Sequence, residues 1–237
     1  MPSGMTPPAL ALRLDRWSTG NAALLSGALL SALWLGKPWP LGVAAFASFS
    51  TLLLLARGTW TRTAGFGAAN AVTLLRLVLV MLLGVALHGA SGVLLGALVL
   101  GTLALDGVDG WLARRTGSAS AFGAHFDMEV DALLVLTACA ELHLSGKFGL
   151  WILCGGVLRY LYVLSVALFP PPGGAMPRTL LGRSSFALMV VGLALGLVCT
   201  GSVGLPAAAL GTMAVVLSFA RSALYGYARA AKPVADI

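Results

Sequence analysis

The chain has 237 residues, of which 59% are hydrophobic and only 10% are charged, and its formal net charge is +7. Its mean hydropathy is +0.94. About a quarter of the residues of a soluble domain are charged, so this composition excludes a soluble globular protein and predicts a polytopic membrane protein. The positive charge suits a membrane face next to anionic lipid, and we infer no nucleic-acid partner.

Hydropathy predicts about eight membrane-spanning helices, because long runs rich in Leu and Ala alternate with short breaks that contain Gly or Pro. The runs lack the alternating ten-residue pattern of a membrane barrel, so the predicted fold is all-α. The expected spans are residues 20–36, 41–56, 70–88, 92–114, 122–145, 148–169, 184–202 and 206–228.

The chain divides at the polar, basic and glycine-containing segment 57–68, "RGTWTRTAGFGA". We predict a two-helix N-terminal appendage over residues 1–64 and a six-helix core over residues 65–237. The resulting fold class is an all-α polytopic membrane protein with two extra N-terminal transmembrane helices.

Lys and Arg predict the orientation. With eight spans, both termini lie on one side, and that side carries most of the basic residues, whereas the opposite side has only Lys37 and Lys147. The positive-inside rule therefore predicts a multi-pass protein with both termini in the cytoplasm.

The acidic residues are concentrated in one place, since five of the eight lie between Asp106 and Asp131. Asp106 and Asp109 are three residues apart, and Asp127 and Asp131 are four apart, so each pair shares one helical face. We expect residues 115–123 to form the turn between two adjacent antiparallel helices. This arrangement predicts four carboxylates near one point at the cytoplasmic surface.

Four carboxylates in a membrane are costly unless they are paired or solvated. Arg114 and Arg115 offset only part of this charge, and divalent cations are the natural complement. Oxygen ligands suit Mg²⁺ or Mn²⁺, and no His/Cys set matches zinc. Small residues leave room beside the carboxylates, which suggests a phosphate-bearing substrate and two metal ions that clamp a pyrophosphate. These small residues are Gly110, Ala113 and Gly123.

The pattern Asp106-x2-Asp109-Gly110-x2-Ala113-Arg114-x8-Gly123-x3-Asp127-x3-Asp131 resembles the signature of the CDP-alcohol phosphotransferase family. Upstream, Asn70-x2-Thr73-x2-Arg76 is similar to a less strict element at the start of the family's first core helix. The six-span core from about residue 65 agrees with the family's architecture, and residues 1–64 fall outside it.

The resemblance implies transfer of a phosphoalcohol from a CDP-alcohol to an acceptor hydroxyl, with release of CMP. It implies a two-metal centre of Mg²⁺ or Mn²⁺ held by Asp106, Asp109 and Asp127, with Asp131 nearby as a further ligand and as the general base. The implied nucleotide-binding residues are Gly110, Ala113, Arg114, Gly123, Asn70 and Thr73.

Three arginines outside the signature are candidates for binding an anionic acceptor or a lipid phosphate: Arg159, Arg178 and Arg183. Arg159 lies within a span and needs an anionic partner; we expect that partner to be a substrate or lipid. Glu129 lies off the face of Asp127 and Asp131, and we expect it to sit at the membrane interface without a functional role.

The favoured function is transfer from CDP-diacylglycerol to a small polar alcohol in phospholipid biosynthesis, because the short loops resemble the prokaryotic branch of the family. This branch implies a bacterial cytoplasmic membrane, with membrane lipid as a partner, and is compatible with a homodimer. One alternative reverses the roles, with a soluble CDP-aminoalcohol as donor and diacylglycerol as acceptor. A divalent-cation transporter is an alternative of another class, and a non-catalytic scaffold is a third.

Overall fold

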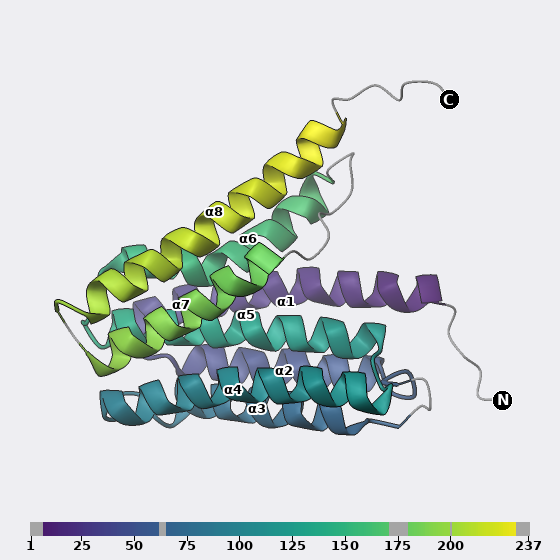
Figure 1. Ribbon diagram of the computed structural model, residues 1–237, viewed down its shortest axis with the longest axis horizontal. Helices are drawn as coiled ribbons and strands as arrows, with labels where there is room; N and C mark the ends of the chain where they lie inside the picture. The colour runs from purple at the N-terminus through teal and green to yellow at the C-terminus, as the bar shows by residue number, and fades with distance from the viewer. Residues whose placement is uncertain (1–6, 62–64, 171–179, 200, 231–237) are drawn as a thin grey trace.

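The computed structural model describes residues 7–61, 65–170, 180–199 and 201–230, and within these ranges it contains helices and no strands. The elements are α1 (Pro7–Leu35), α2 (Trp39–Leu55), α3 (Ala68–Val85), α4 (Gly92–Thr116), α5 (Ala121–Leu144), the 3₁₀ turn η1 (Leu150–Ile152), α6 (Leu153–Leu168), α7 (Leu180–Val198) and α8 (Gly204–Ala230) (Figure 1). This all-α architecture confirms the predicted fold class.

Five helical segments are long and apolar enough to cross a membrane: Leu10–Leu35, Ala68–Val85, Gly92–Thr116, Leu150–Leu168 and Gly204–Ser222. The apolar segments Trp39–Leu55 and Gly182–Val198 are shorter. The chain is therefore an integral membrane protein. α1 begins at Pro7, well before the predicted span at residue 20, so its first turns carry charged residues such as Arg13 and Asp15.

The turn between α4 and α5 is shorter than the expected segment 115–123. α4 continues to Thr116 and ends where Gly117 adopts a left-handed conformation with φ of 63°, which glycine reaches without steric cost. α5 begins with Ser120 as its N-cap, whose Oγ accepts from the Gly123 N–H at 2.9 Å. Both ends of the turn are therefore set by local sequence.

α5 is the central helix. Almost every residue from Val130 to Leu142 is buried, because α1, α3, α6 and α7 all pack against it. α4 and α5 were expected to lie side by side, yet they touch at only a few points. α3 instead packs against both of them. The two helices that carry the aspartate motif are therefore bridged by the first helix of the core.

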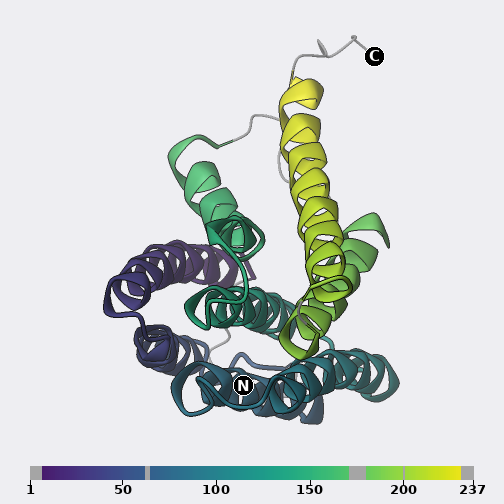
Figure 2. The same cartoon turned by 90° about the vertical axis from the view of Figure 1, so that its left-hand side faces the viewer.

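The helices form two groups. Helices α1 to α5 run roughly along one direction, and α6, α7 and α8 are tilted away from them (Figures 1 and 2). A cavity of about 590 Å³ lies between the groups, lined by residues of α4, α5, α6, α7 and α8. The tilt thus opens a space beside the acidic segments of α4 and α5.

The N-terminal helix pair packs on the rest of the molecule. α1 contacts α2, α5 and α6, and α2 contacts α3. Trp17 of α1 is buried and donates through Nε1 to the carbonyl oxygen of Ser48 on α2 at 3.0 Å. The pair therefore extends the buried core.

Candidate functional site

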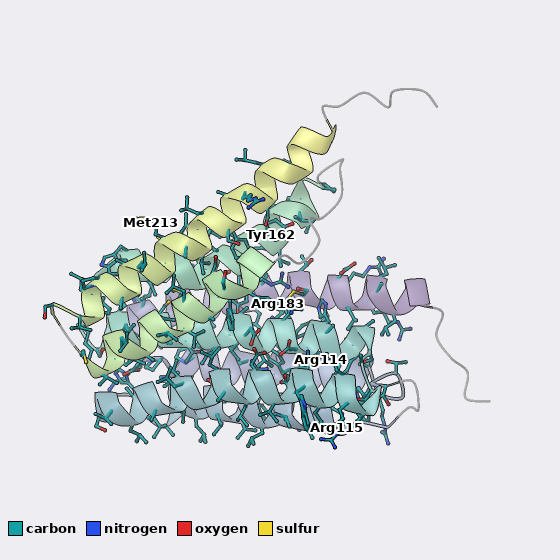
Figure 3. All side chains as sticks on the ribbon, viewed as in Figure 1. Arg114, Arg115, Tyr162, Arg183 and Met213 are labelled. Carbon is teal, nitrogen blue, oxygen red and sulfur yellow. The ribbon has the colours of Figure 1, made fainter. Side chains whose placement is uncertain are left out.

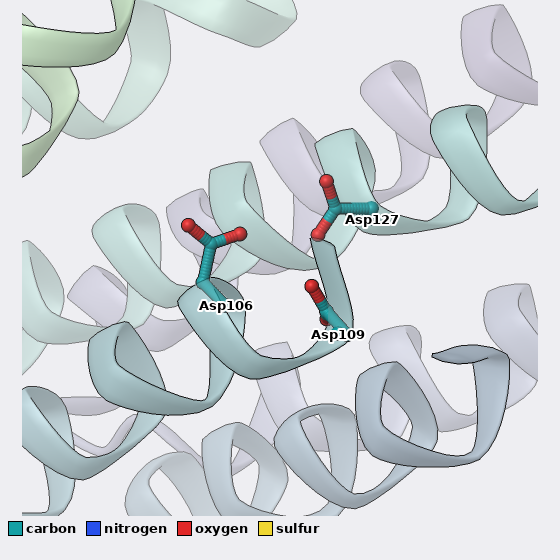
Figure 4. Close-up of side chains that lie close together, drawn as sticks. All are labelled: Asp106, Asp109 and Asp127. Carbon is teal, nitrogen blue, oxygen red and sulfur yellow. The ribbon is translucent and has the colours of Figure 1, made fainter. Parts of the chain in front are cut away.

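Three aspartates converge at the cavity. One carboxylate oxygen from each of Asp106, Asp109 and Asp127 lies within 4.8 Å of the other two, and the close-up shows the three carboxylates around one point (Figure 4). The spacing along α4 and α5 places them there, because residues three or four apart share a helical face. Asp131, one turn beyond Asp127, also lines the cavity but is outside this group of three.

Arg76 of α3 lies between all four carboxylates. Its Nη1 is 2.7 Å from Asp127 Oδ1, 2.8 Å from Asp109 Oδ2 and 3.3 Å from Asp106 Oδ1. Its Nη2 donates to Asp131 Oδ1. The Arg76 side chain is only 1% exposed. The arginine is therefore the internal counter-charge of the cluster, and it links α3 to both α4 and α5.

Sequence reasoning missed this role of Arg76, although a signal was present. Asn70, Thr73 and Arg76 recur every three residues, so they share one face of α3. A charged residue in an apolar helix requires an ionic partner. The four aspartates of α4 and α5 were the acidic cluster available to pair with Arg76.

The aspartate cluster fits divalent cations. A single guanidinium leaves three of four negative charges uncompensated, and the Asp106 and Asp127 side chains are 32% and 26% exposed. Carboxylate oxygens within this distance of one another, at the edge of a cavity, are the donor set that Mg²⁺ or Mn²⁺ takes. Asp106, Asp109 and Asp127 are the residues that would hold such an ion.

The residues expected to bind a nucleotide fall into two groups. Gly110 and Arg114 line the cavity. An added Cβ on Gly110 would meet only Arg114 Nη1, at 3.4 Å, so packing does not require glycine there. Arg115, next in sequence, lies instead over the Trp111 ring at 4.9 Å, and Figure 3 labels both arginines near the end of α4.

The second group supports the helices instead of lining the cavity. Thr73 Oγ1 donates to Asp109 Oδ2 at 3.0 Å, and Asn70 Nδ2 donates to the Phe66 carbonyl at 2.6 Å. An added Cβ on Gly123 would lie 2.7 Å from Asn70 Oδ1, so this glycine permits the close approach of α3 and α5. Ala113 is half-buried on α4.

Two of the three candidate acceptor residues line the cavity. Arg159 reaches it from α6 and Arg183 from the first turn of α7, and Figure 3 labels Arg183 near the start of that helix. Arg178 lies outside the described residues. The cavity therefore has acidic residues on α4 and α5, with arginines on α4, α6 and α7.

Two expectations for buried charges were wrong. Glu129 does not sit at the membrane interface, because it is only 1% exposed inside the protein. Arg159 has a protein partner, since its Nη2 donates to Glu129 Oε1 at 2.6 Å. Both errors have one cause: Glu129 points to the side of α5 away from Asp127, and sequence alone did not show that α1 and α6 cover that side.

A known protein family matches the part of this chain that follows α2. The family model described as CDP-alcohol phosphatidyltransferase matches residues 66–220. Two curated proteins of Mycobacterium tuberculosis, from strains CDC 1551 / Oshkosh and ATCC 25618 / H37Rv, are each named probable phosphatidylglycerophosphate synthase. Each is 32% identical over 133 residues, which are 54% of this chain and 64% of the relative. The similarity therefore spans slightly less than two thirds of these relatives. No solved structure matches the chain significantly.

Proposed function

The chain belongs to the CDP-alcohol phosphatidyltransferase family, and we propose that it transfers a phosphatidyl group from CDP-diacylglycerol to a small polar alcohol with release of CMP. The observation that carries this proposal is the convergence of Asp106, Asp109 and Asp127 at the edge of a cavity of about 590 Å³. That size suits a small-molecule site. The cavity is lined by the aspartates on α4 and α5 and by apolar side chains such as Phe186 of α7 and Phe219 of α8, a mixture that suits a lipid with a charged head group.

The donor diphosphate would lie against the aspartate cluster. Asp106, Asp109 and Asp127 would hold two Mg²⁺ or Mn²⁺ ions, which supply charge neutralisation for the diphosphate and for an in-line displacement. Gly110 leaves room for the nucleotide beside α4, and Arg114 donates to its phosphate from the same helix. Arg76 keeps the carboxylates close together when they would otherwise repel.

The acceptor hydroxyl would react next to Asp131. Its oxygen attacks the phosphatidyl phosphorus, the bond from that phosphorus to the oxygen of CMP breaks, and the hydroxyl proton passes to the Asp131 carboxylate. Asp131 is suited to this role because it lines the cavity outside the group of three aspartates. Arg159 of α6 and Arg183 of α7 line the same cavity, where they would hold an anionic group of the acceptor.

The site would face the cytoplasm of a bacterial cell. The end of α4 that carries Arg114 and Arg115 is also the end at which α1 begins (Figures 1 and 3). Basic residues near membrane-spanning helices are retained on the cytoplasmic side. Both termini would then be cytoplasmic, and the soluble acceptor and CMP would exchange with the cytoplasm.

The test is a transfer assay with purified protein in detergent or vesicles. CDP-diacylglycerol and Mg²⁺ or Mn²⁺ are supplied with a panel of acceptors that includes glycerol 3-phosphate, glycerol, serine and inositol 1-phosphate. CMP release and the lipid product are followed together, the latter by mass spectrometry. CMP release only from a soluble CDP-aminoalcohol with diacylglycerol would reverse the assignment of donor and acceptor. Metal transport without any CMP release would reject a transferase.

A further inference from the structure

A buried chain of polar side chains joins the N-terminal helix pair to the cavity. Ser18 Oγ of α1 donates to Glu129 Oε1 at 2.7 Å, and Asn21 Nδ2 of α1 donates to Glu129 Oε2 at 3.1 Å. On α2, Ser48 Oγ donates to Asn21 Oδ1 at 2.7 Å. All four side chains are buried. This series of hydrogen bonds therefore begins in α1 and α2. Both helices precede residue 66, the first residue that the family model matches.

This series of hydrogen-bonded side chains reaches the cavity through Arg159. The guanidinium of Arg159 donates to the same Glu129 oxygen that accepts from Ser18. Arg159 is 18% exposed and lines the cavity from α6. Glu129 thus receives two donors from α1 and one from α6.

Packing alone does not account for this network. Apolar side chains alone would be enough to dock the two extra helices. A buried carboxylate, in contrast, is costly unless its oxygens are fully hydrogen-bonded. Well-packed apolar residues often replace a buried ion pair without loss of stability. A buried carboxylate is useful where it holds a charged partner at a defined position. Here the partner of Glu129 is the Arg159 guanidinium, at the wall of the cavity.

We infer that the N-terminal helix pair is a positioning element of the active site: Ser18 and Asn21 hold Glu129, and Glu129 sets the position of Arg159 toward the acceptor. This inference rests on the proposed transferase function. It assigns to α1 a role in acceptor recognition, although α1 lines no part of the cavity among the described residues. Glu129 and the two α1 residues act through Arg159 and touch no substrate.

The principal variant replaces Ser18 and Asn21 together by Ala, and the readout separates acceptor KM, donor KM and kcat. Loss of two donors leaves Arg159 as the main partner of Glu129, so the guanidinium is drawn away from the cavity. We expect acceptor KM to rise about three- to tenfold, which corresponds to hydrogen-bond energies of this class. Donor KM should change by less than about twofold. The probe is glycerol 3-phosphate, or the alcohol used best by the wild type.

Thr19→Ala is the matched control, because Thr19 neighbours Ser18 but its Oγ1 donates to the Asp15 carbonyl of its own helix at 3.1 Å. Its kinetic constants should equal those of the wild type. A second test repeats the Ser18→Ala and Asn21→Ala pair in an Arg159→Gln background. There the pair should produce no further rise in acceptor KM, since the residue through which it acts is gone.

Three outcomes are distinguishable. A wild type that transfers nothing from CDP-diacylglycerol overturns the proposed function and this inference with it. An active wild type whose α1 variant keeps its acceptor KM, or loses donor and acceptor affinity equally, overturns the inference alone. An effect of the α1 pair that persists unchanged without Arg159 also overturns it, because the helix would then act by general packing.

Discussion

Nη1 of Arg76 lies 2.8 Å from Oδ2 of Asp109, and both side chains are almost fully buried, with exposed fractions of 1% and 6%. This pair fastens α3 to α4 inside the membrane protein, and Thr73 adds a second donor to the same oxygen. A buried pair of this kind leaves an uncompensated charge when one partner is removed. The geometry of the whole aspartate cluster therefore depends on one arginine.

Arg76→Gln should destabilise the metal-free protein by about 3–5 kcal/mol, because it leaves buried aspartates without their counter-charge. Thermal unfolding in detergent with EDTA measures this loss. Added Mg²⁺ should recover part of it, since divalent ions supply replacement charge. Arg57→Gln, at an exposed position, is the control and should leave the unfolding temperature unchanged. An Arg76→Gln protein as stable as wild type in EDTA contradicts the counter-charge role.

Chelation of divalent cations should abolish transfer. One guanidinium balances only one of four carboxylates, so binding a donor diphosphate at this site requires additional positive charge. CMP release is measured after excess EDTA and again after Mg²⁺ or Mn²⁺ is restored. Activity that survives EDTA would show that the aspartates work without a metal.

Asp131→Asn should separate chemistry from binding. If Asp131 takes the acceptor proton, kcat falls about 10²–10⁴-fold while donor affinity is largely retained. Asp127→Asn is the comparison and should lose donor affinity as well, because Asp127 belongs to the group of three converging carboxylates. Isothermal titration with CDP-diacylglycerol alongside steady-state kinetics makes the distinction. Equal loss of donor affinity in both variants would make Asp131 a ligand instead of a base.

Gly110→Leu should close the proposed nucleotide space without unfolding the protein. The added Cβ meets only Arg114 Nη1 at 3.4 Å, and a helical glycine already costs about 1 kcal/mol relative to Ala. CMP binding should be lost at an unfolding temperature close to that of the wild type. A folded Gly110→Leu protein with normal CMP affinity would place the nucleotide elsewhere.

Gly123→Ala should affect stability, in contrast to a substitution at Gly110. Its Cβ would lie 2.7 Å from Asn70 Oδ1, and Asn70 has little freedom to move because Nδ2 donates to the Phe66 carbonyl. Overpacking of this kind costs about 1–3 kcal/mol. Gly123→Ala should therefore lower the unfolding temperature, whereas Gly110→Ala should not.

Arg183→Ala should raise the KM of a phosphorylated acceptor about 10–150-fold, as expected for loss of a charge-assisted hydrogen bond. Arg183 is exposed and lines the cavity on α7. Arg115→Ala is the matched control, since Arg115 lies over Trp111 and should leave acceptor KM unchanged. With glycerol as acceptor, neither variant should differ from wild type. Unchanged KM for every acceptor would remove Arg183 from the acceptor site.

Local sequence was sufficient to predict the helices and the acidic pairs. Apolar runs of membrane length require helices, because backbone groups in lipid must be hydrogen-bonded within their own segment. The spacing of Asp106 with Asp109, and of Asp127 with Asp131, places each pair on one helical face, and Gly117 and Ser120 end and begin the helices that carry them. These features depend on residues no more than a few positions apart.

Tertiary structure decided which charges meet. Arg76 is 33 residues from Asp109 and 55 from Asp131, and Ser18 is 111 residues from Glu129. Which helix covers which face is weakly encoded in an apolar chain, since lipid tails are as apolar as the leucines that would otherwise drive packing. Sequence therefore determined where the carboxylates lie along the chain, and only the packing of α1, α3 and α6 around α5 assigned a partner to each buried charge.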